Sequence, residues 1–169
     1  MGQVDKNTKF ENFTISLALF DALPVIFFSL ASIFIGLSIE SVIFVVGAII
    51  TFLSGSLKVI WKIIVATKKK NIWPLFIQMR IVMPLGFLIM LVGFIVCLVN
   101  KDLTSFWQSL LNPVSIIFLI VGFLGMILMT IFAVKLDSSD SLSNWIEQGT
   151  NAISQIAFFI AFLIAFILK

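Results

Sequence analysis

The sequence contains no histidine and a single cysteine in its 169 residues. Without histidine, the chain lacks the commonest general base and the usual ligand of zinc and haem iron. Cys97 has no partner for an internal disulfide and lies in an apolar run, which predicts a buried thiol. The sequence also has no glycine-rich phosphate-binding loop and no metalloprotease motif. We therefore expect a protein that is not an enzyme and that carries no cofactor and no metal.

Charged residues are scarce as well. They make up 11% of the chain, whereas soluble domains typically contain about 25%. Hydrophobic residues make up 61%, and the mean hydropathy is +1.21. This composition excludes a soluble domain and predicts an all-α polytopic integral membrane protein, with residues 1–169 forming a single transmembrane domain. We expect the lipid bilayer, and no nucleic acid, as its partner.

Five apolar stretches account for most of the chain. We predict membrane spans at residues 14–38, 42–66, 75–99, 114–134 and 146–168. Each has about 20 residues or more, which is enough to cross a hydrocarbon core of about 30 Å. The segment 103–111 mixes aromatic and polar residues and predicts a short helix in the membrane interface. The first span exceeds the roughly 7–15 residues of a signal-peptide core, so we expect it to remain as a transmembrane helix.

Basic residues are distributed unevenly over the two sides of these spans. Nine of the eleven lie on the N-terminal side or in the half-spans nearest to it. Only Lys101 and Lys169 fall on the opposite side. By the positive-inside rule, the N-terminus is cytoplasmic and the C-terminus is extracytoplasmic. We expect a multi-pass protein of the cell membrane, in a bacterial plasma membrane.

Two charged residues lie deep inside the first two spans. Asp21 and Lys58 are five and four residues from the respective span centres, or about 6–8 Å from the midplane at about 1.5 Å per residue. The turn at 38–41 is so short that the two spans must be antiparallel neighbours. Both charges then lie at the same depth, where each costs roughly 2.5–3.5 kcal/mol if isolated. We predict that they form an ion pair.

Further polar groups occur at the same level. Pro24 and Pro84 each remove a helical hydrogen bond, which frees the carbonyls of Phe20 and Arg80. The fifth span has a stripe of polar residues at helical spacing. We predict that these groups form one ligand-binding site, the polar collar, consisting of Asp21, Lys58, Arg80, Glu147, Asn151 and Gln155.

Each of these residues also has a purely structural interpretation. The ion pair could serve only to fix the register of two helices. Lys62 and Arg80 could extend their long side chains to the headgroups. The stripe in the fifth span could be the start of an interfacial helix, with Ser143 as its N-cap.

Two functions remain open. The first is a small membrane transporter or channel-like protein, with a cytoplasm-facing polar cavity for a polar or anionic solute. The alternative is a non-transporting membrane subunit, for assembly, regulation or immunity, whose polar stripe docks a protein partner or a lipid headgroup. Five short spans enclose little volume, so we expect a homo-oligomer or a membrane partner to complete any permeation path. A cavity reaching Asp21 favours the first function, whereas a closed and fully paired collar favours the second.

Overall fold

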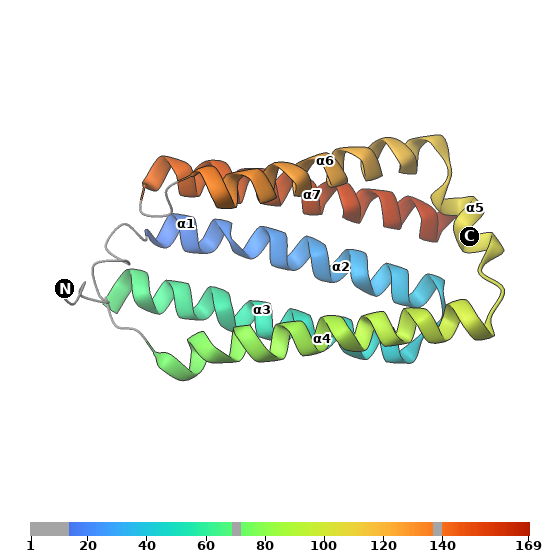
Figure 1. The fold of residues 1–169 in the computed structure, drawn as a ribbon, viewed down its shortest axis with the longest axis horizontal. Helices are drawn as coiled ribbons and strands as arrows, with labels where there is room; N and C mark the ends of the chain where they lie inside the picture. The colour runs from blue at the N-terminus through green and yellow to red at the C-terminus, as the bar shows by residue number, and fades with distance from the viewer. Residues whose placement is uncertain (1–13, 69–71, 137–139) are drawn as a thin grey trace.

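The computed structural model describes residues 14–68, 72–136 and 140–169, which form seven helices and no strand (Figure 1). The helices are α1 (Ile15–Phe20), α2 (Ala22–Ser38), α3 (Val42–Lys68), α4 (Trp73–Asn100), α5 (Thr104–Leu110), α6 (Pro113–Lys135) and α7 (Ser141–Leu168). Four of the nine basic residues that we counted on the N-terminal side, Lys6, Lys9, Lys69 and Lys70, lie outside the described residues.

Five helical segments of this part of the chain are long and apolar enough to cross a membrane. The first consists of α1 and α2 together, and the other four are α3, α4, α6 and α7. The prediction of an all-α protein with five membrane spans is therefore confirmed. The short helix expected at 103–111 is present as α5, and its place at the membrane surface stays a prediction.

Local capping sets where the later helices begin. The side chain of Asn112 accepts a hydrogen bond from the Val114 N–H at 3.0 Å, and Pro113 opens α6. At the start of α7, Asp140 is the N-cap, and its carboxylate accepts hydrogen bonds from the N–H and the hydroxyl of Ser143, both at 2.9 Å. The prediction of Ser143 as the cap was therefore wrong. A carboxylate satisfies the free N–H groups better because it carries a full negative charge.

The five spans pack in an open row rather than in a closed ring. Along the row the order is α4, α3, α2, α7 and α6, and each helix packs against the next (Figure 1). Among the described residues, α4 and α7 lie on opposite sides of α2 and α3 and do not form a comparable interface. The row therefore leaves α4 and α6 as its two edges.

Glycines allow the closest approach in this row, between α3 and α4. A Cβ atom on Gly47 would lie 2.7 Å from the carbonyl oxygen of Gly86, and one on Gly93 would lie 2.6 Å from the backbone nitrogen of Phe44. Close backbone approach at small residues is how membrane helices gain van der Waals contact, since burial of apolar surface drives little association in lipid. This interface fixes α4 firmly on α3.

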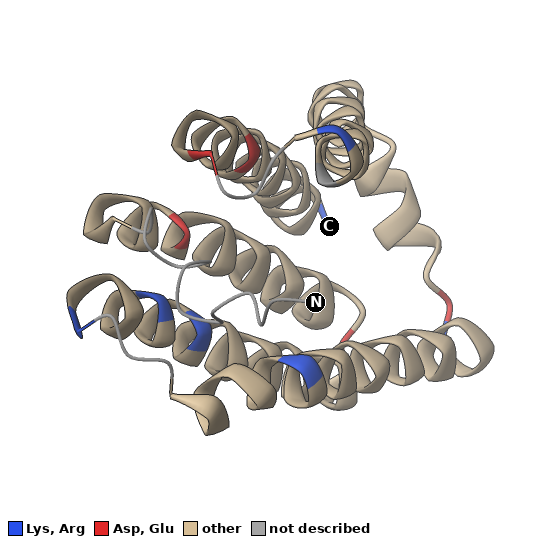
Figure 2. Cartoon of the chain, turned by 60° about the vertical axis from the view of Figure 1, so that its left-hand side comes forward, with Lys and Arg blue, Asp and Glu red and all other residues tan. Residues whose placement is uncertain are grey.

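The two ends of the bundle differ in charge. We call the end at which α1, α4 and α7 begin the basic end, because most lysines of the described chain lie toward it (Figures 1 and 2). The opposite, far end holds the turn between α2 and α3, the short helix α5 and the C-terminus (Figure 1). At the far end, Lys101 donates a hydrogen bond to the Glu40 carbonyl at 2.9 Å, and Lys169 donates one to the Ser38 carbonyl.

Candidate functional site

The site is centred on a break in the first span. Asp21 separates α1 from α2, and its N–H donates to the Leu17 carbonyl at 3.0 Å. Pro24 follows three residues later and has no N–H for the carbonyl of Phe20. By contrast, α4 continues through Pro84 without interruption. The first span is therefore interrupted at the buried carboxylate of Asp21. Pro84 has no such neighbour in α4 and does not interrupt that helix.

Two lysines of α3 bind this carboxylate. Lys62 Nζ lies 2.8 Å from Asp21 Oδ2, and Lys58 Nζ lies 3.4 Å from the same oxygen. Both contacts are ion pairs, and Lys62 makes the shorter one. The predicted pairing of Asp21 with Lys58 is present. The interpretation of Lys62 as a residue that extends toward the headgroups was wrong. Lys62 lies one helical turn after Lys58 on α3, and the buried carboxylate of Asp21 holds its side chain inside the bundle.

The two lysines are not equivalent. The side chain of Lys62 is 10% exposed, whereas that of Lys58 is 28% exposed. The negative charge of Glu147 on α7 also acts on Lys62 through space. Lys62 is therefore the closer and better-enclosed partner of Asp21. Asp21 contacts both ammonium groups, and Lys58 is the more exposed and more distant of the two.

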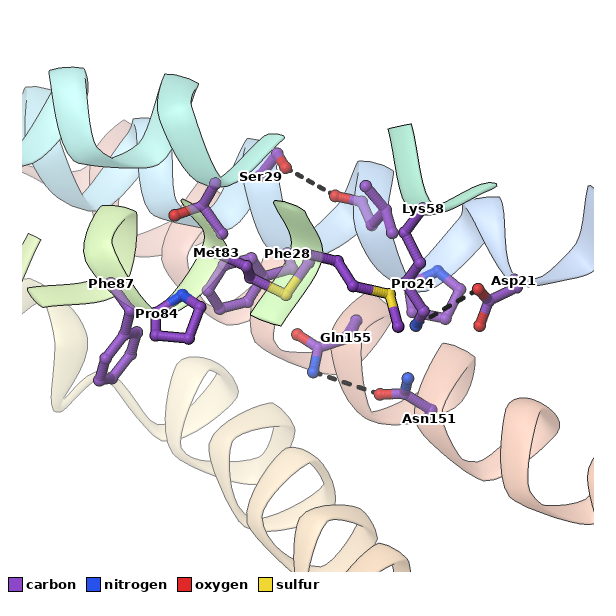
Figure 3. A pocket seen from close by; sticks show the side chains of 13 residues that line it. Asp21, Pro24, Phe28, Ser29, Lys58, Met83, Pro84, Phe87, Asn151 and Gln155 are labelled. Atoms are coloured by element: carbon purple, nitrogen blue, oxygen red, sulfur yellow. Dashed lines mark hydrogen bonds and ion pairs between the residues drawn. The ribbon is translucent and has the colours of Figure 1, made fainter. Parts of the chain in front are cut away.

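A cavity of about 520 Å³ adjoins Lys58 (Figure 3). Its lining comes from the break and the first turns of α2, from α3, from α4 and from α7: Asp21, Pro24, Val25, Phe28, Ser29, Thr51, Lys58, Met79, Met83, Pro84, Phe87, Asn151 and Gln155. The helices α4 and α7 supply opposite walls, and they do not form an interface with each other among the described residues. The open row is what leaves room for this cavity.

The cavity is polar at one end only. Asp21, Lys58 and Asn151 lie toward the basic end, and Phe28 and Phe87 lie deeper in the bundle (Figure 3). Two deep hydroxyl groups do not change this, because each donates to the backbone of its own helix, as serine and threonine often do. Ser29 Oγ donates to the Val25 carbonyl at 2.7 Å, and Thr51 Oγ1 donates to the Gly47 carbonyl at 2.9 Å.

The amide of Gln155 lies between the polar and the apolar parts. Its nitrogen donates to Asn151 Oδ1 at 3.5 Å and contacts the Met126 sulfur at 3.7 Å. Its oxygen Oε1 is buried and has no hydrogen-bond partner, although the residue is only 8% exposed and lines the cavity. A buried amide with one unsatisfied group in a cavity wall is an unusual feature, since most buried polar atoms are paired. It marks a position where a bound molecule would gain a hydrogen bond.

The structure brings together four of the six residues predicted for the polar collar. Asp21, Lys58, Asn151 and Gln155 line the cavity, whereas Arg80 and Glu147 do not. Arg80 is exposed, and its guanidinium lies over the ring of Phe76 at 4.6 Å from the centroid. The structure does not bring Arg80 to the cavity, because its guanidinium stacks on a ring of the same helix, and a role of Arg80 in binding stays a prediction. Glu147 is half-buried on α7 and acts on Lys62 rather than on the cavity.

Sequence reasoning missed two features of the site. The first is the role of Lys62, although its spacing of four residues from Lys58 places both on one helical face. The second is the apolar wall of α4, formed by Met79, Met83 and Phe87. No signal in the sequence distinguishes Met83 and Phe87 from lipid-facing residues, because their neighbours on α4 are equally apolar. Met79 lies between Gln78 and Arg80, but its own side chain carries no polar group to indicate a site.

Comparisons with known proteins give no information on function. No protein-family model and no curated protein matches the sequence, and no solved structure matches the fold. Function is therefore argued from the residues that line the cavity and from their charges.

Proposed function

We propose that the protein is a small membrane transporter or channel-like protein that binds a polar or anionic solute in a cytoplasm-facing cavity. The observation that supports this function is the cavity of about 520 Å³ beside the Asp21–Lys58 pair. Its volume falls within the range of about 300–1,000 Å³ typical of small-molecule sites. An ionisable group inside a membrane span that borders a cavity marks a substrate or ion pathway more often than a structural contact.

The charges beside the cavity favour an anion. Lys62 is the closer partner of Asp21, at 2.8 Å, so the more distant and more exposed Lys58 is the cation that a solute in the cavity can contact. The surrounding walls are apolar, and low-dielectric walls concentrate the field of such a cation. The amides of Asn151 and Gln155 supply neutral hydrogen-bonding groups that would orient a bound solute.

The orientation follows from the distribution of lysines. Nine of the eleven basic residues lie, in the sequence, on the N-terminal side of the predicted spans or in the half-spans nearest to it, so we infer that this side, and with it the polar part of the cavity, faces the cytoplasm of a bacterial cell. A reporter fused after Lys169 is expected to be extracytoplasmic, and one inserted at residues 68–71 is expected to be cytoplasmic. If both reporters are cytoplasmic, the topology and the direction of the cavity are wrong.

Transport also requires a route to the far end. The first span is interrupted at Asp21 by a single residue whose backbone stays in the α-helical region, so it does not by itself form such a route. The open row leaves α4 and α6 as edges, so a second copy or a membrane partner would complete a path across the bilayer. A homo-oligomer is the simplest such assembly.

One observation favours the alternative, a non-transporting subunit. Asp21 is 1% exposed and has two ion-pair partners, which is the arrangement expected of a clip that fixes α1 against α3. In that case the cavity would dock a lipid headgroup or a segment of a partner protein.

Flux measurements decide between the two functions. Purified protein in liposomes is expected to carry at least one member of a panel of small anions, such as phosphate, amino acids and nucleobases. The Lys58→Met variant should lose this flux at least tenfold, because it removes the cation beside the cavity. The matched control is Lys135→Met, which removes an exposed lysine in the last turn of α6. The absence of any flux, together with no change in melting temperature for any anion, would favour the non-transporting subunit.

A further inference from the structure

The cavity opens sideways between two spans. Its walls on α4 and α7 both belong to helices that can cross the membrane, and these helices do not form an interface among the described residues. An opening between the sides of two spans faces the hydrocarbon of the bilayer. Phe87 is a lining residue of α4 that is also 55% exposed, as expected at such an opening. A molecule dissolved in the bilayer can therefore reach the cavity without crossing water.

The cavity is also elongated along the membrane normal. Its lining on α2 extends from Pro24 to Ser29, and Asp21 lies three residues before it. Eight residues from Asp21 to Ser29 correspond to about 12 Å at about 1.5 Å per residue. Charge and amides occupy the end nearest the membrane surface, and apolar side chains occupy the end nearest the bilayer centre. This is the polarity of a lipid-like molecule, with its head at the surface and its chain pointing inward.

Two features select the head group. Lys58 provides a partly exposed cation at the polar end, and its companion Lys62 is the closer partner of Asp21. One turn deeper than Asn151, the buried oxygen of Gln155 has no partner. The amide can donate or accept after rotation about its last bond, so it can bind a protonated or an unprotonated oxygen of an acid. Lys58 matches a phosphate or a carboxylate directly, and Gln155 matches one when its amide NH2 group, or a protonated acid oxygen facing its Oε1, makes the contact.

We propose that this cavity binds an amphipathic anion with a single apolar chain, which enters from the bilayer between α4 and α7. The acidic head would bind Lys58 and Gln155, and the chain would lie along Phe28, Met83 and Phe87. Methionine side chains adapt to ligands of different shape, so Met79 and Met83 allow chains of more than one length. This inference rests on the proposed function, since it specifies the solute that the same cavity takes.

Thermal unfolding in nanodiscs of zwitterionic lipid tests the inference. The probes are decyl phosphate, decanoate, inorganic phosphate and decyltrimethylammonium. A ligand present at 100 times its dissociation constant raises the melting temperature of a protein of this size by about 5–10 °C. We expect this increase with decyl phosphate or decanoate, and none with the cationic amphiphile. Inorganic phosphate should bind at least tenfold more weakly than decyl phosphate, because it lacks the chain.

Three variants localise the effect. Lys58→Met should weaken binding of the amphipathic anion at least tenfold, and it keeps the Asp21–Lys62 pair, so the protein should still fold. Met83→Trp should fill the apolar end and block the chain. Lys135→Met should bind like the unchanged protein.

The outcomes separate the inference from the proposed function. Equal shifts of the melting temperature with inorganic phosphate and decyl phosphate would show that the apolar chain does not contribute to binding. The inference would then fail, and the proposed anion site would remain. The absence of a shift with every anion would contradict the proposed function as well. A shift that survives Lys58→Met would mean that the amphiphile acts through the bilayer, which would overturn the assignment to this cavity.

Discussion

At each end of the bundle, one carboxylate forms ion pairs with two lysines. The two groups differ in the exposure of the carboxylate, in the elements that supply the lysines and in what else the lysines contact. At the basic end, Asp21 is 1% exposed, and both of its lysines come from α3. Lys62 is the closer one, at 2.8 Å, and Lys58 borders a cavity. Lys58 is therefore the lysine of this group that a molecule in the cavity can contact.

At the far end, Glu40 is 73% exposed, and its lysines come from distant parts of the chain, just after α4 and at the C-terminus. These lysines bind mainly backbone. Lys101 donates to the carbonyls of Ile39 and Glu40 at 3.4 and 2.9 Å, and Lys169 donates to the carbonyl of Ser38. Backbone carbonyls thus accept the hydrogen bonds of these two lysines, and these contacts hold the turn between α2 and α3. The same three charges form a structural clamp at one end and a candidate binding site at the other.

The largest difference between the ends should appear when the carboxylate is neutralised. Asp21→Asn leaves two adjacent ammonium groups inside the bundle, and loss of one partner of a buried ion pair typically costs about 3–5 kcal/mol. Glu40→Gln removes an exposed carboxylate, which typically costs about 0–1 kcal/mol. Unfolding of both variants in the same detergent measures the difference. Similar losses at the two ends would remove the distinction between a buried and a solvated group.

A smaller effect should separate the two lysines of the basic end. Lys62→Met removes the closer partner of Asp21 and should lower the stability by about 1–3 kcal/mol, as for a hydrogen bond to a charged group. Lys58→Met should cost less than about 1 kcal/mol, because Asp21 keeps Lys62.

The double variant sharpens this comparison. With both lysines replaced, Asp21 has no cation, so the loss of stability should exceed the sum of the two single losses. Additive losses would show that the two lysines act on Asp21 independently, and the idea of one shared site would fail.

The smallest effect concerns pH at the helix starts. The N–H and hydroxyl of Ser143 hold the pKa of Asp140 below its ordinary value at the basic end, and the hydroxyl and N–H of Thr104 do the same for the pKa of Asp102 at the far end. A depressed folded-state pKa means that each stabilisation is fully present above the unfolded pKa of about 3.9 and is lost as the pH falls through the folded value. The backbone amide signals of Ser143 and Thr104 should therefore shift only below about pH 4. Asp140→Asn keeps a capping oxygen and should abolish the change at Ser143, whereas a change centred near neutral pH would contradict this account.

The sequence predicted the helices and the Asp21–Lys58 pair because both depend on local properties. Apolar length determines a span, and residue number along an antiparallel hairpin determines depth, so the Asp21–Lys58 pair could be predicted. The direction of long side chains could not be predicted, since Lys62 and Arg80 have similar surroundings in the sequence. One points to a carboxylate and the other lies over Phe76. Their choice depends on which helix faces which, and that follows from packing.

The order of the helices in the row could not be predicted either, because it also depends on which helix packs against which. Beyond its first turns α4 is apolar on every face, so its pattern there does not distinguish the face on α3 from the face on the cavity or on lipid. The glycines Gly86 and Gly93 mark the α3 contact only once their partners on α3 are known. The apolar half of the cavity was missed because it has no polar residue to indicate it.

The central claim is that Lys58 faces an accessible cavity and Lys62 does not. Cysteine substitution tests it directly, since the single native cysteine, Cys97, is buried and gives little background. The variants Lys58→Cys and Lys62→Cys would be treated, in the folded state, with a small anionic methanethiosulfonate reagent, and the rates of modification compared. We predict that position 58 reacts at least ten times faster than position 62. Equal rates, or protection of position 58, would contradict the account.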